Sequence, residues 1–270
     1  MLKLYHGKGS VCSVKVRIGL AEKCLNWDSF LIDLPKGEQF APDYLKLNPN
    51  AVVPTLVDGD FVVIESSVIL QYIDNLNDDY ILMPADVKAR TITLIWLLRC
   101  LDIHAAINTM TFSTVGREKI IAVKTAAEIE KSINKMPNPK AASKRLDLIN
   151  NGLSSQHVVA DFFTLHRLLD DMQTALEKST WLTGNNYQMA DTALIAYVDR
   201  LDRLGMSGLW EQRFPAISNW LEASKARPSY ETGLDPFISK NETENTRRTG
   251  EKIWPEVKQR WDDFIKTAVK

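Results

Sequence analysis

The chain has 270 residues, 45% hydrophobic and 25% charged, which is the balance of a globular protein long enough for one or two domains. Its formal net charge of −1 gives no electrostatic reason to expect nucleic acid or an anionic membrane as a partner, and no run approaches the ~18 apolar residues of a membrane span. Three cysteines without CxxC spacing, Cys12, Cys24 and Cys100, argue against a disulfide framework and a metal site. Together with the absence of a signal peptide, they predict a reducing, cytoplasmic location.

Strand and helix patterns alternate over residues 1–79. Leu2–His6 alternates like a short strand, and the Asp58-Gly59 turn between apolar runs predicts a β-hairpin. The predicted order is a strand at 2–6, a helix at 14–25, a strand at 30–34, a hairpin at 55–64 and a helix at 68–76 capped by Ser66 or Ser67. This order predicts a small α/β unit with a mixed sheet.

After a polar linker at 76–86, the strand patterns disappear. Apolar residues then recur every three or four positions, as they do in amphipathic helices. Helices are predicted at 86–112, 159–176, 193–204 and 217–221, with two polar helical stretches on either side of 136–139 and an amphipathic helix from Ile253 onward. We therefore predict an α/β first domain at 1–79 and an all-helical second domain at 86–270.

Two short motifs give the first domain a functional interpretation. Val53-Pro54 precedes a predicted strand, and Glu65-Ser66 precedes a predicted helix. In this combination they resemble the glutathione-binding half of the cytosolic glutathione transferases. The resemblance implies a thioredoxin-like fold for the first domain and a helical bundle for the second. It also implies that Pro54 is cis and that the N–H and C=O of Val53 bind the cysteinyl part of glutathione.

Glu65 and Ser66 also have a direct physical interpretation. Glutathione ends in a γ-glutamyl group that carries an ammonium and a carboxylate. Glu65 can pair with the cation, and Ser66 at a helix N-terminus can hold the anion with the help of the helix dipole. Such a sequence is by itself more often a simple N-cap, so the assignment depends on Val53-Pro54. The resemblance further implies that Gln39 contacts the glycine carboxylate of glutathione, with Lys36 as a competing residue.

The loop before the first predicted helix holds the candidate catalytic residues Ser10, Cys12 and Ser13. It resembles the zeta-class motif SSCSxRVR, with Val and Lys at the second and sixth positions. The resemblance implies that Ser10 donates a hydrogen bond to the glutathione sulfur and, with the following helix N-terminus, favours the thiolate. Ser13 is predicted to cap that helix. Cys12 is predicted either to modulate the reaction or to be a half-buried small hydrophobic residue.

The second domain offers a predicted acceptor pocket and a folding motif. Arg99, His104 and Asn108 are polar residues of one predicted helix and are candidates for the pocket that receives the electrophile. Each of them alone is more often exposed or structural. Asp191 lies in a stretch that resembles the family's C-domain signature, although Gln188 replaces the usual Ser or Thr of its capping box. We predict that Asp191 accepts backbone N–H bonds and serves folding.

These features predict a glutathione S-transferase that uses glutathione as co-substrate and activates it as a thiolate against a small hydrophobic electrophile. The long middle segment and the stretch at 154–172 resemble the glutathione-dependent β-aryl etherases. The loop at Ser10 instead resembles the zeta class, which includes maleylacetoacetate and maleylpyruvate isomerases. Ether cleavage, cis–trans isomerisation and a non-catalytic binding or scaffold role are therefore all kept as alternatives. The resemblance also implies a homodimer, and no nucleic acid, membrane or metal partner is predicted.

Overall fold

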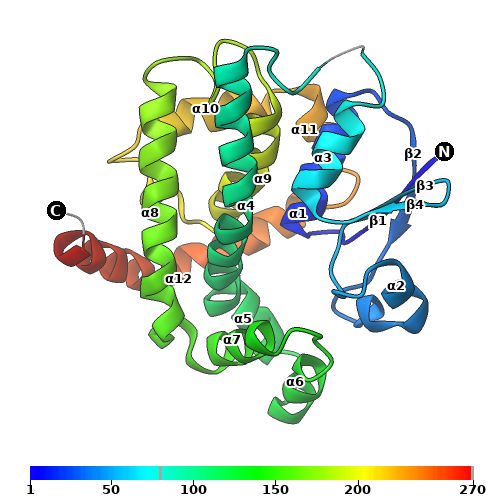
Figure 1. Cartoon of the computed structure of the whole chain (residues 1–270). Helices are drawn as coiled ribbons and strands as arrows, with labels where there is room; N and C mark the ends of the chain where they lie inside the picture. The colour runs from blue at the N-terminus through cyan, green and yellow to red at the C-terminus, as the bar shows by residue number, and fades with distance from the viewer. Residues whose placement is uncertain (79–80, 269–270) are drawn as a thin grey trace. The chain divides into compact units, whose positions relative to one another are not determined.

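The computed structural model describes residues 1–78 and 81–268, whose contacts divide into two compact units. The first unit comprises residues 1–100, 174–198 and 219–239, and the second comprises residues 101–173, 199–218 and the segment from Lys240. The expected fold class, a small mixed sheet with helices followed by a mostly helical remainder, is confirmed (Figure 1). The predicted domain boundary between 79 and 86 stays a prediction.

The sheet has four strands: β1 (Leu2–His6), β2 (Trp27–Leu31), β3 (Thr55–Asp58) and β4 (Phe61–Val63). Their order is β2-β1-β3-β4; β1 pairs with β2 in parallel, and the other two pairs are antiparallel. Gly59 in the β3–β4 turn has a φ of 62°, a left-handed conformation that glycine adopts without steric cost. The predicted hairpin and the strand at 2–6 are therefore confirmed.

Helices α1 (Val11–Glu22) and α3 (Ser66–Asp74) pack closely against each other. Gly19 lies at their contact, where an added Cβ would be 2.4 Å from Leu70 Cδ2. Their shared core includes apolar side chains with no exposed surface from β1, β3, α1 and α3, among them Leu4, Leu56, Val14, Leu70 and Ile73. The short helix α2 (Pro42–Leu47) and the 3-10 turn η1 (Glu38–Phe40) were not predicted, because neither has an apolar period.

Nine helices follow in the part of the chain described after α3. They are α4 (Val87–Ser113), α5 (Val115–Ile121), α6 (Ala126–Ile133), α7 (Pro139–Asn151), α8 (Gln156–Leu176), α9 (Met189–Arg203), α10 (Ala216–Lys225), α11 (Pro228–Leu234) and α12 (Lys240–Ala268). All predicted helices are present. The sequence missed α11 and the polar start of α12, which packs through Gly250, where a Cβ would lie 1.7 Å from Leu204 O.

Asp191 in the first turn of α9 has the folding role that the sequence predicts. Its carboxylate accepts hydrogen bonds from the N–H groups of Leu182 and Gln188, both at 3.0 Å. Trp220 Nε1 of α10 donates a third hydrogen bond at 2.8 Å. One buried carboxylate therefore joins the loop before α9, the start of α9 and α10.

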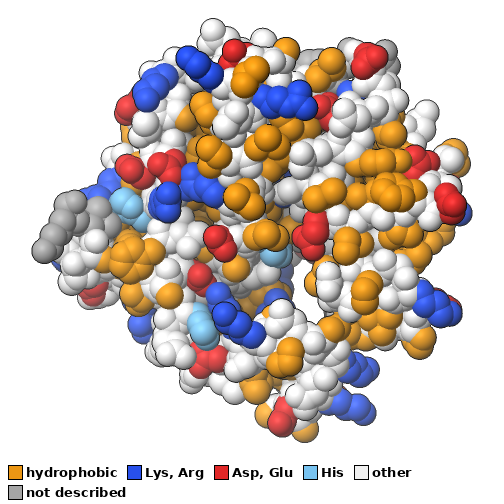
Figure 2. Space-filling model, viewed as in Figure 1, with side chains coloured by type: hydrophobic (Ala, Val, Ile, Leu, Met, Phe, Trp, Pro, Cys, Tyr) orange, Lys and Arg blue, Asp and Glu red, His pale blue; other side chains and the backbone are white. Residues whose placement is uncertain are grey.

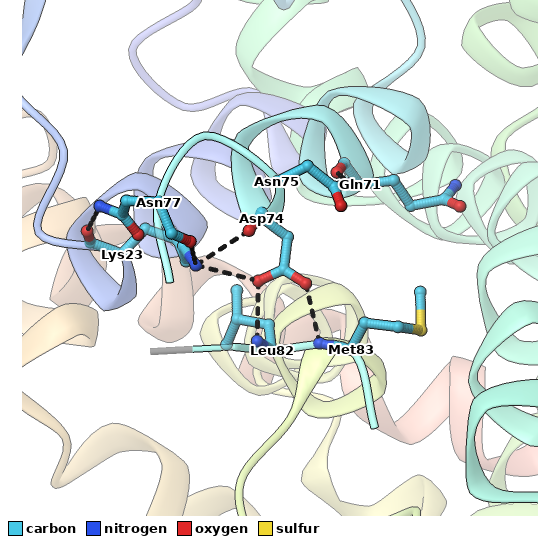
Figure 3. Close-up of polar contacts among 7 residues, drawn as sticks. All are labelled: Lys23, Gln71, Asp74, Asn75, Asn77, Leu82 and Met83. Carbon is cyan, nitrogen blue, oxygen red and sulfur yellow. Dashed lines mark hydrogen bonds and ion pairs between the residues drawn. The ribbon is translucent and has the colours of Figure 1, made fainter. Parts of the chain in front are cut away.

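A buried ion pair at the C-terminal end of α1 is saturated by protein groups (Figure 3). Lys23 Nζ lies 3.3 Å from Asp74 Oδ1 and donates to the carbonyls of Asp74 and Asn77 at 3.0 and 2.9 Å. The Asp74 carboxylate accepts from the N–H groups of Leu82 and Met83 at 2.7 and 2.9 Å. These bonds tie the end of α3 to the chain that leads into α4.

Helix α4 is unusually apolar on its outer side. Leu94, Ile95 and Leu98 are 43%, 51% and 73% exposed, and Figure 2 shows hydrophobic side chains gathered along this helix. By length and composition alone α4 could cross a membrane, which differs from the expectation that no run reaches that length. Its other side is buried through Trp96, Leu97 and further residues. A core helix of a globular protein can have the same length and apolar composition, so these two features alone do not indicate a membrane span.

Candidate functional site

Ser10, and not Ser13, caps helix α1. The helix begins at Val11, and Ser10 Oγ accepts a hydrogen bond from the N–H of Ser13 at 3.4 Å. The predicted cap at Ser13 is therefore wrong, because the helix starts earlier than its apolar pattern. Ser13 is fully buried, and its Oγ accepts from the N–H of Gly7 at 3.1 Å. Nothing in the described chain accepts the hydroxyl proton of Ser10, so this half-buried group can donate to a ligand.

Cys12 is half-buried and directs its thiol to Tyr197 of α9. Burial raises the pKa of the Tyr197 phenol well above its ordinary value, and the neighbouring Cys12 and Cys100 sulfurs raise this pKa further. Lys15 Nζ lies 5.2 Å from the centre of the same ring and donates to Ser67 Oγ at 3.0 Å. Cys12 is thus part of a polar cluster, which the sequence spacing could not reveal. Its role in catalysis stays a prediction.

The backbone of the loop before Ser10 is held by Arg17, a residue that the sequence analysis did not single out. Arg17 is 1% exposed. Its guanidinium donates to the carbonyls of Gly7 and Lys8 at 3.2 and 3.1 Å, and to the carbonyl of Gly233 in α11 at 2.7 Å. It also lies 4.2 Å from the ring centre of Phe237. Arg17 therefore fixes the loop to the segment that follows α10.

His6 completes this arrangement as a neutral imidazole. Its Nδ1 lies 3.1 Å from Arg17 Nη1, and its Nε2 lies 2.8 Å from Ser29 Oγ. A guanidinium can only donate, so Nδ1 must accept and the ring proton resides on Nε2. Burial and the charge of Arg17 lower the pKa of His6 to about 3. His6 is thus a structural support for the loop and has no proton to exchange near neutral pH.

Val53 and Pro54 have the geometry that the resemblance implies. The Val53-Pro54 bond is cis. Tyr44 and Asn48 hydrogen-bond the carbonyl of Val52, whereas across residues 1–78 and 81–268 nothing pairs with the N–H or C=O of Val53. An added Cβ at Gly7 would lie 3.2 Å from Val53 Cγ2. The unpaired backbone groups therefore lie beside the loop that leads to Ser10.

Glu65 and Ser66 form a second set of open polar groups at the start of α3. Glu65 is the N-cap residue with a φ of 68°, an uncommon conformation for a residue other than glycine and one that clusters at functional sites. Its exposed carboxylate and the hydroxyl of Ser66 have no partner in the described structure. The predicted capping of α3 by Ser66 or Ser67 is wrong, since no side chain caps this helix. Ser67 instead donates to the carbonyl of Leu97.

Gln39 and its competitor Lys36 lie in different environments. Gln39 Oε1 is sealed from solvent and has no hydrogen-bond partner in the described structure. A buried amide oxygen left unpaired costs about 1–3 kcal/mol, which indicates a missing donor. Lys36 is exposed and pairs with Asp33 at 2.9 Å. The Gln39 amide therefore has no partner among the described residues, whereas Lys36 is engaged by Asp33. Which of the two donates to the glycine carboxylate stays a prediction.

The predicted acceptor residues are only partly brought together. His104 Nε2 and Asn108 Nδ2 lie 2.9 Å apart on one face of α4 and belong to the second unit. Arg99 belongs to the first unit, where its guanidinium lies 4.6 Å from the ring centre of Trp96. The role of all three residues in acceptor binding stays a prediction.

Two family models match this chain. Residues 1–75 match the glutathione S-transferase N-terminal domain, and residues 164–223 match the glutathione S-transferase C-terminal domain. The chain belongs to the glutathione S-transferase family. The N-terminal match contains Ser10, Gln39, Val53, Glu65 and Ser66, so the open polar groups described above all lie in the part of the chain with this match.

Individual relatives match either most of this chain or about a third of it. Tetrachloro-p-hydroquinone reductive dehalogenase of Sphingobium chlorophenolicum is 28% identical over 86% of this chain and 94% of its own length. The crystal structure of the beta-etherase LigF from Sphingobium has a TM-score of 0.76 at 26% identity, covering 87% of this chain and 99% of LigF. A zeta-class glutathione S-transferase of Euphorbia esula is 43% identical, but over only 34% of this chain and 40% of its own length. The likeness to LigF is thus global, and the zeta likeness is local.

Proposed function

We propose that this chain is a glutathione S-transferase that binds glutathione as co-substrate and activates its thiol for attack on a small hydrophobic electrophile. The observation that carries the proposal is the open hydroxyl of Ser10 at the start of α1, in a loop whose Gly7 lies beside Val53 with its unpaired backbone. Family membership supports the same conclusion.

Each open polar group fits a part of glutathione. The N–H and C=O of Val53 suit the cysteinyl backbone. The amide Nε2 of Gln39 can donate to the glycine carboxylate, and its unpaired Oε1 can accept from an N–H of the ligand. The Glu65 carboxylate suits the γ-glutamyl ammonium, and Ser66 in the first turn of α3 suits the γ-glutamyl carboxylate. These assignments use only groups that the protein itself leaves unpaired.

Activation requires a lower thiol pKa. A free thiol has a pKa of about 8.5, so only a small fraction is thiolate at neutral pH. A shift of two units makes the thiolate predominant and corresponds to about 2.7 kcal/mol. A hydrogen bond from the Ser10 hydroxyl and the N-terminal dipole of α1 together can stabilise the thiolate by about this free energy.

The global likeness to LigF favours attack at an ether carbon, in which the thiolate displaces an aryloxide. The local zeta likeness, together with the zeta-like motif at Ser10, favours the alternative of glutathione-dependent cis–trans isomerisation. A panel with a β-aryl ether, an aromatic halide and maleylpyruvate distinguishes these reactions. Glutathione consumed with release of a phenol supports ether cleavage, whereas isomerisation regenerates glutathione.

Titration calorimetry with glutathione tests the first requirement of the proposal, which is that the protein binds glutathione. Binding at millimolar glutathione or below is expected, and no binding would reject both the enzyme and a glutathione-binding scaffold. Ultraviolet absorbance of the bound thiolate then compares Ser10→Ala, Ser10→Thr and Cys12→Ala. We expect a raised thiol pKa in Ser10→Ala, near wild-type behaviour in Ser10→Thr, and little change in Cys12→Ala.

We also propose a cytoplasmic homodimer. The apolar outer side of α4, together with Phe61 and Val68, which are 56% and 48% exposed, supports a protein partner for this surface. Cys12, Cys24 and Cys100 are free thiols, which suits a reducing compartment. Sedimentation analysis of Leu98→Glu against Leu31→Glu, a substitution at an exposed leucine of β2, tests the dimer. Only the first is expected to yield monomers.

A further inference from the structure

Arg145 of α7 is a cation without a counterion in the described structure. Its guanidinium carbon lies 3.3 Å from the ring centre of Phe112 on α4. That stacking is its one contact of this kind in the part of the chain described, since no hydrogen bond or ion pair reaches it. None of its nitrogens is sealed from solvent. The guanidinium is therefore held in one place, with its N–H groups still open to a ligand.

Three other buried or half-buried arginines of the second unit have carboxylate or carbonyl acceptors. Arg203 and Arg247 pair with Asp199 and Asp202, each at 2.7 Å, and Arg117 donates to the carbonyl of Ile149 at 2.9 Å. Burial lowers the pKa of Arg145 to about 10, with no carboxylate acting against it. Partial loss of hydration disfavours the charged form of Arg145, and an anion that reaches the guanidinium would offset this cost.

The carboxylate on the facing helix is already engaged. Asp161 of α8 accepts from Lys144 Nζ at 2.6 Å and from the hydroxyl of Thr109. Lys144 is the sequence neighbour of Arg145, and Thr109 is the neighbour of Asn108. The Asp161 carboxylate is therefore already paired, and among the described residues no ion pair joins it to Arg145.

Phe112 connects Arg145 to the polar face of α4. His104, Asn108 and Phe112 are four residues apart and lie on one face of the helix. Helical side chains lean toward the helix N-terminus, so the Phe112 ring that carries Arg145 leans toward Asn108. Asn108 and His104 are already in contact at 2.9 Å. Arg145 therefore stacks on a residue of the α4 face that also carries Asn108 and His104, all within the second unit.

We propose that Arg145, with Asn108 and His104, binds a carboxylate group of the acceptor substrate, so that the preferred electrophiles are small aromatic or unsaturated acids. The inference rests on the proposed transferase function. Stacking on Phe112 fixes the guanidinium plane, and a fixed guanidinium can bind both oxygens of a carboxylate in parallel. Arg145 is then a specificity-determining residue.

Titration calorimetry with two ligands that carry no leaving group tests the site without turnover. The probes are meta-dinitrobenzoate and its neutral amide, meta-dinitrobenzamide. We expect the wild-type protein to prefer the acid, and Arg145→Met to lose at least about tenfold in affinity for the acid but not for the amide. Arg145→Lys should retain part of the preference. The matched control is Arg167→Met, which removes a surface arginine of α8 that lies 3.8 Å from Asp171 and should change neither affinity.

Two results would overturn the proposal: no preference for the acid in the wild-type protein, or equal losses for acid and amide in Arg145→Met. Urea unfolding establishes whether each variant is folded, and Phe112→Leu provides a second route, because loss of the stacking should weaken the acid selectively. Glutathione binding to the same proteins separates the two hypotheses. If glutathione fails to bind, the transferase function fails. If glutathione binds but the affinity for the acid is the same in wild type and Arg145→Met, only the proposed carboxylate site is rejected.

Discussion

Arg17 in the first unit and Arg145 in the second are arginines in two contrasting regions. Arg17 is 1% exposed and donates to three backbone carbonyls. Among the described residues Arg145 makes no hydrogen bond or ion pair and stacks on the face of Phe112. The Arg17 region is saturated by its own protein, as is the Lys23–Asp74 pair at the far end of α1 (Figure 3). The Arg145 region keeps its donors open.

The same contrast occurs within the first unit. Around Ser10, Val53 and Gln39, polar groups lack protein partners, although the elements that carry them are well packed. Saturated groups stabilise the fold, and leaving them unpaired would cost stability. Open groups on rigid elements contribute to ligand binding instead. Substitutions in the two kinds of region should therefore affect different measurements.

The largest expected effect is on stability. Arg17→Met leaves the buried carbonyls of Gly7, Lys8 and Gly233 without donors, and we expect a loss of about 3 kcal/mol or more in unfolding free energy. Arg145→Met removes one stacking contact and should cost about 1 kcal/mol or less. Urea unfolding of both proteins measures the difference. Equal losses would show that the contrast between saturated and open arginines is false.

The next effect is on activity. Ser10→Ala should lower kcat/KM by about 10- to 100-fold, the value of one hydrogen bond to a charged sulfur. The cap that Ser10 provides is long, at 3.4 Å, so the loss of stability should stay near about 1 kcal/mol. Initial rates and urea unfolding of the same variant separate the two contributions. A large loss of stability with unchanged kcat/KM would place Ser10 among the saturated structural groups.

His6 provides a pH test of the saturated region. Its pKa is lowered from 6.5 to about 3 in the fold, so between these values the unfolded chain binds a proton that the folded chain does not. Stability is therefore complete above pH 6.5 and falls with acidification, by up to about 1.4 kcal/mol per pH unit. Other groups titrate in the same range. The measurement is thus the difference in unfolding free energy between wild type and His6→Gln at several pH values. An unchanged difference from neutral to acid pH would contradict the neutral imidazole, and His157→Gln is the control.

The smallest effect tests the open region. Gln39→Ala should raise the KM for glutathione severalfold and leave kcat unchanged, because about 1 kcal/mol of binding is lost to substrate and transition state alike. Lys36→Ala is the matched control, since Lys36 is exposed and paired with Asp33. A raised KM for glutathione in Lys36→Ala with an unchanged KM in Gln39→Ala would instead indicate that Lys36 binds the glycine carboxylate.

The sequence predicted most of the fold, because its elements have strong periodic patterns. The hairpin at Asp58-Gly59 and the long helices were found from apolar spacing and turn residues. Helix α11 and the start of α12 were missed, because 240–252 is polar throughout and packs through a small contact at Gly250. The apolar period begins at Val14 and so predicts a cap at Ser13, whereas α1 begins at Val11. Spacing alone cannot locate a helix start when its first turn is not periodic.

The open groups near Ser10 could be predicted because they lie in contiguous motifs. Arg17 and Arg145 could not be identified in the same way. Arg17 acts through Gly233, which is distant in sequence, and Arg145 meets Phe112 only when α7 packs on α4. A lone arginine in a polar stretch looks like any exposed cation. Only the packed structure reveals whether its donors are used.

Val53 has a consequence for how this protein tolerates mutation. The groups that we propose for glutathione are its main-chain N–H and C=O, while its side chain is 8% exposed and packs inward. Every residue type except proline supplies the same two groups. In a saturation library at position 53, isoleucine and similar apolar residues should therefore remain active, and selection should act only on side-chain size. Recognition through the main chain leaves this position free to drift in evolution while the ligand stays the same.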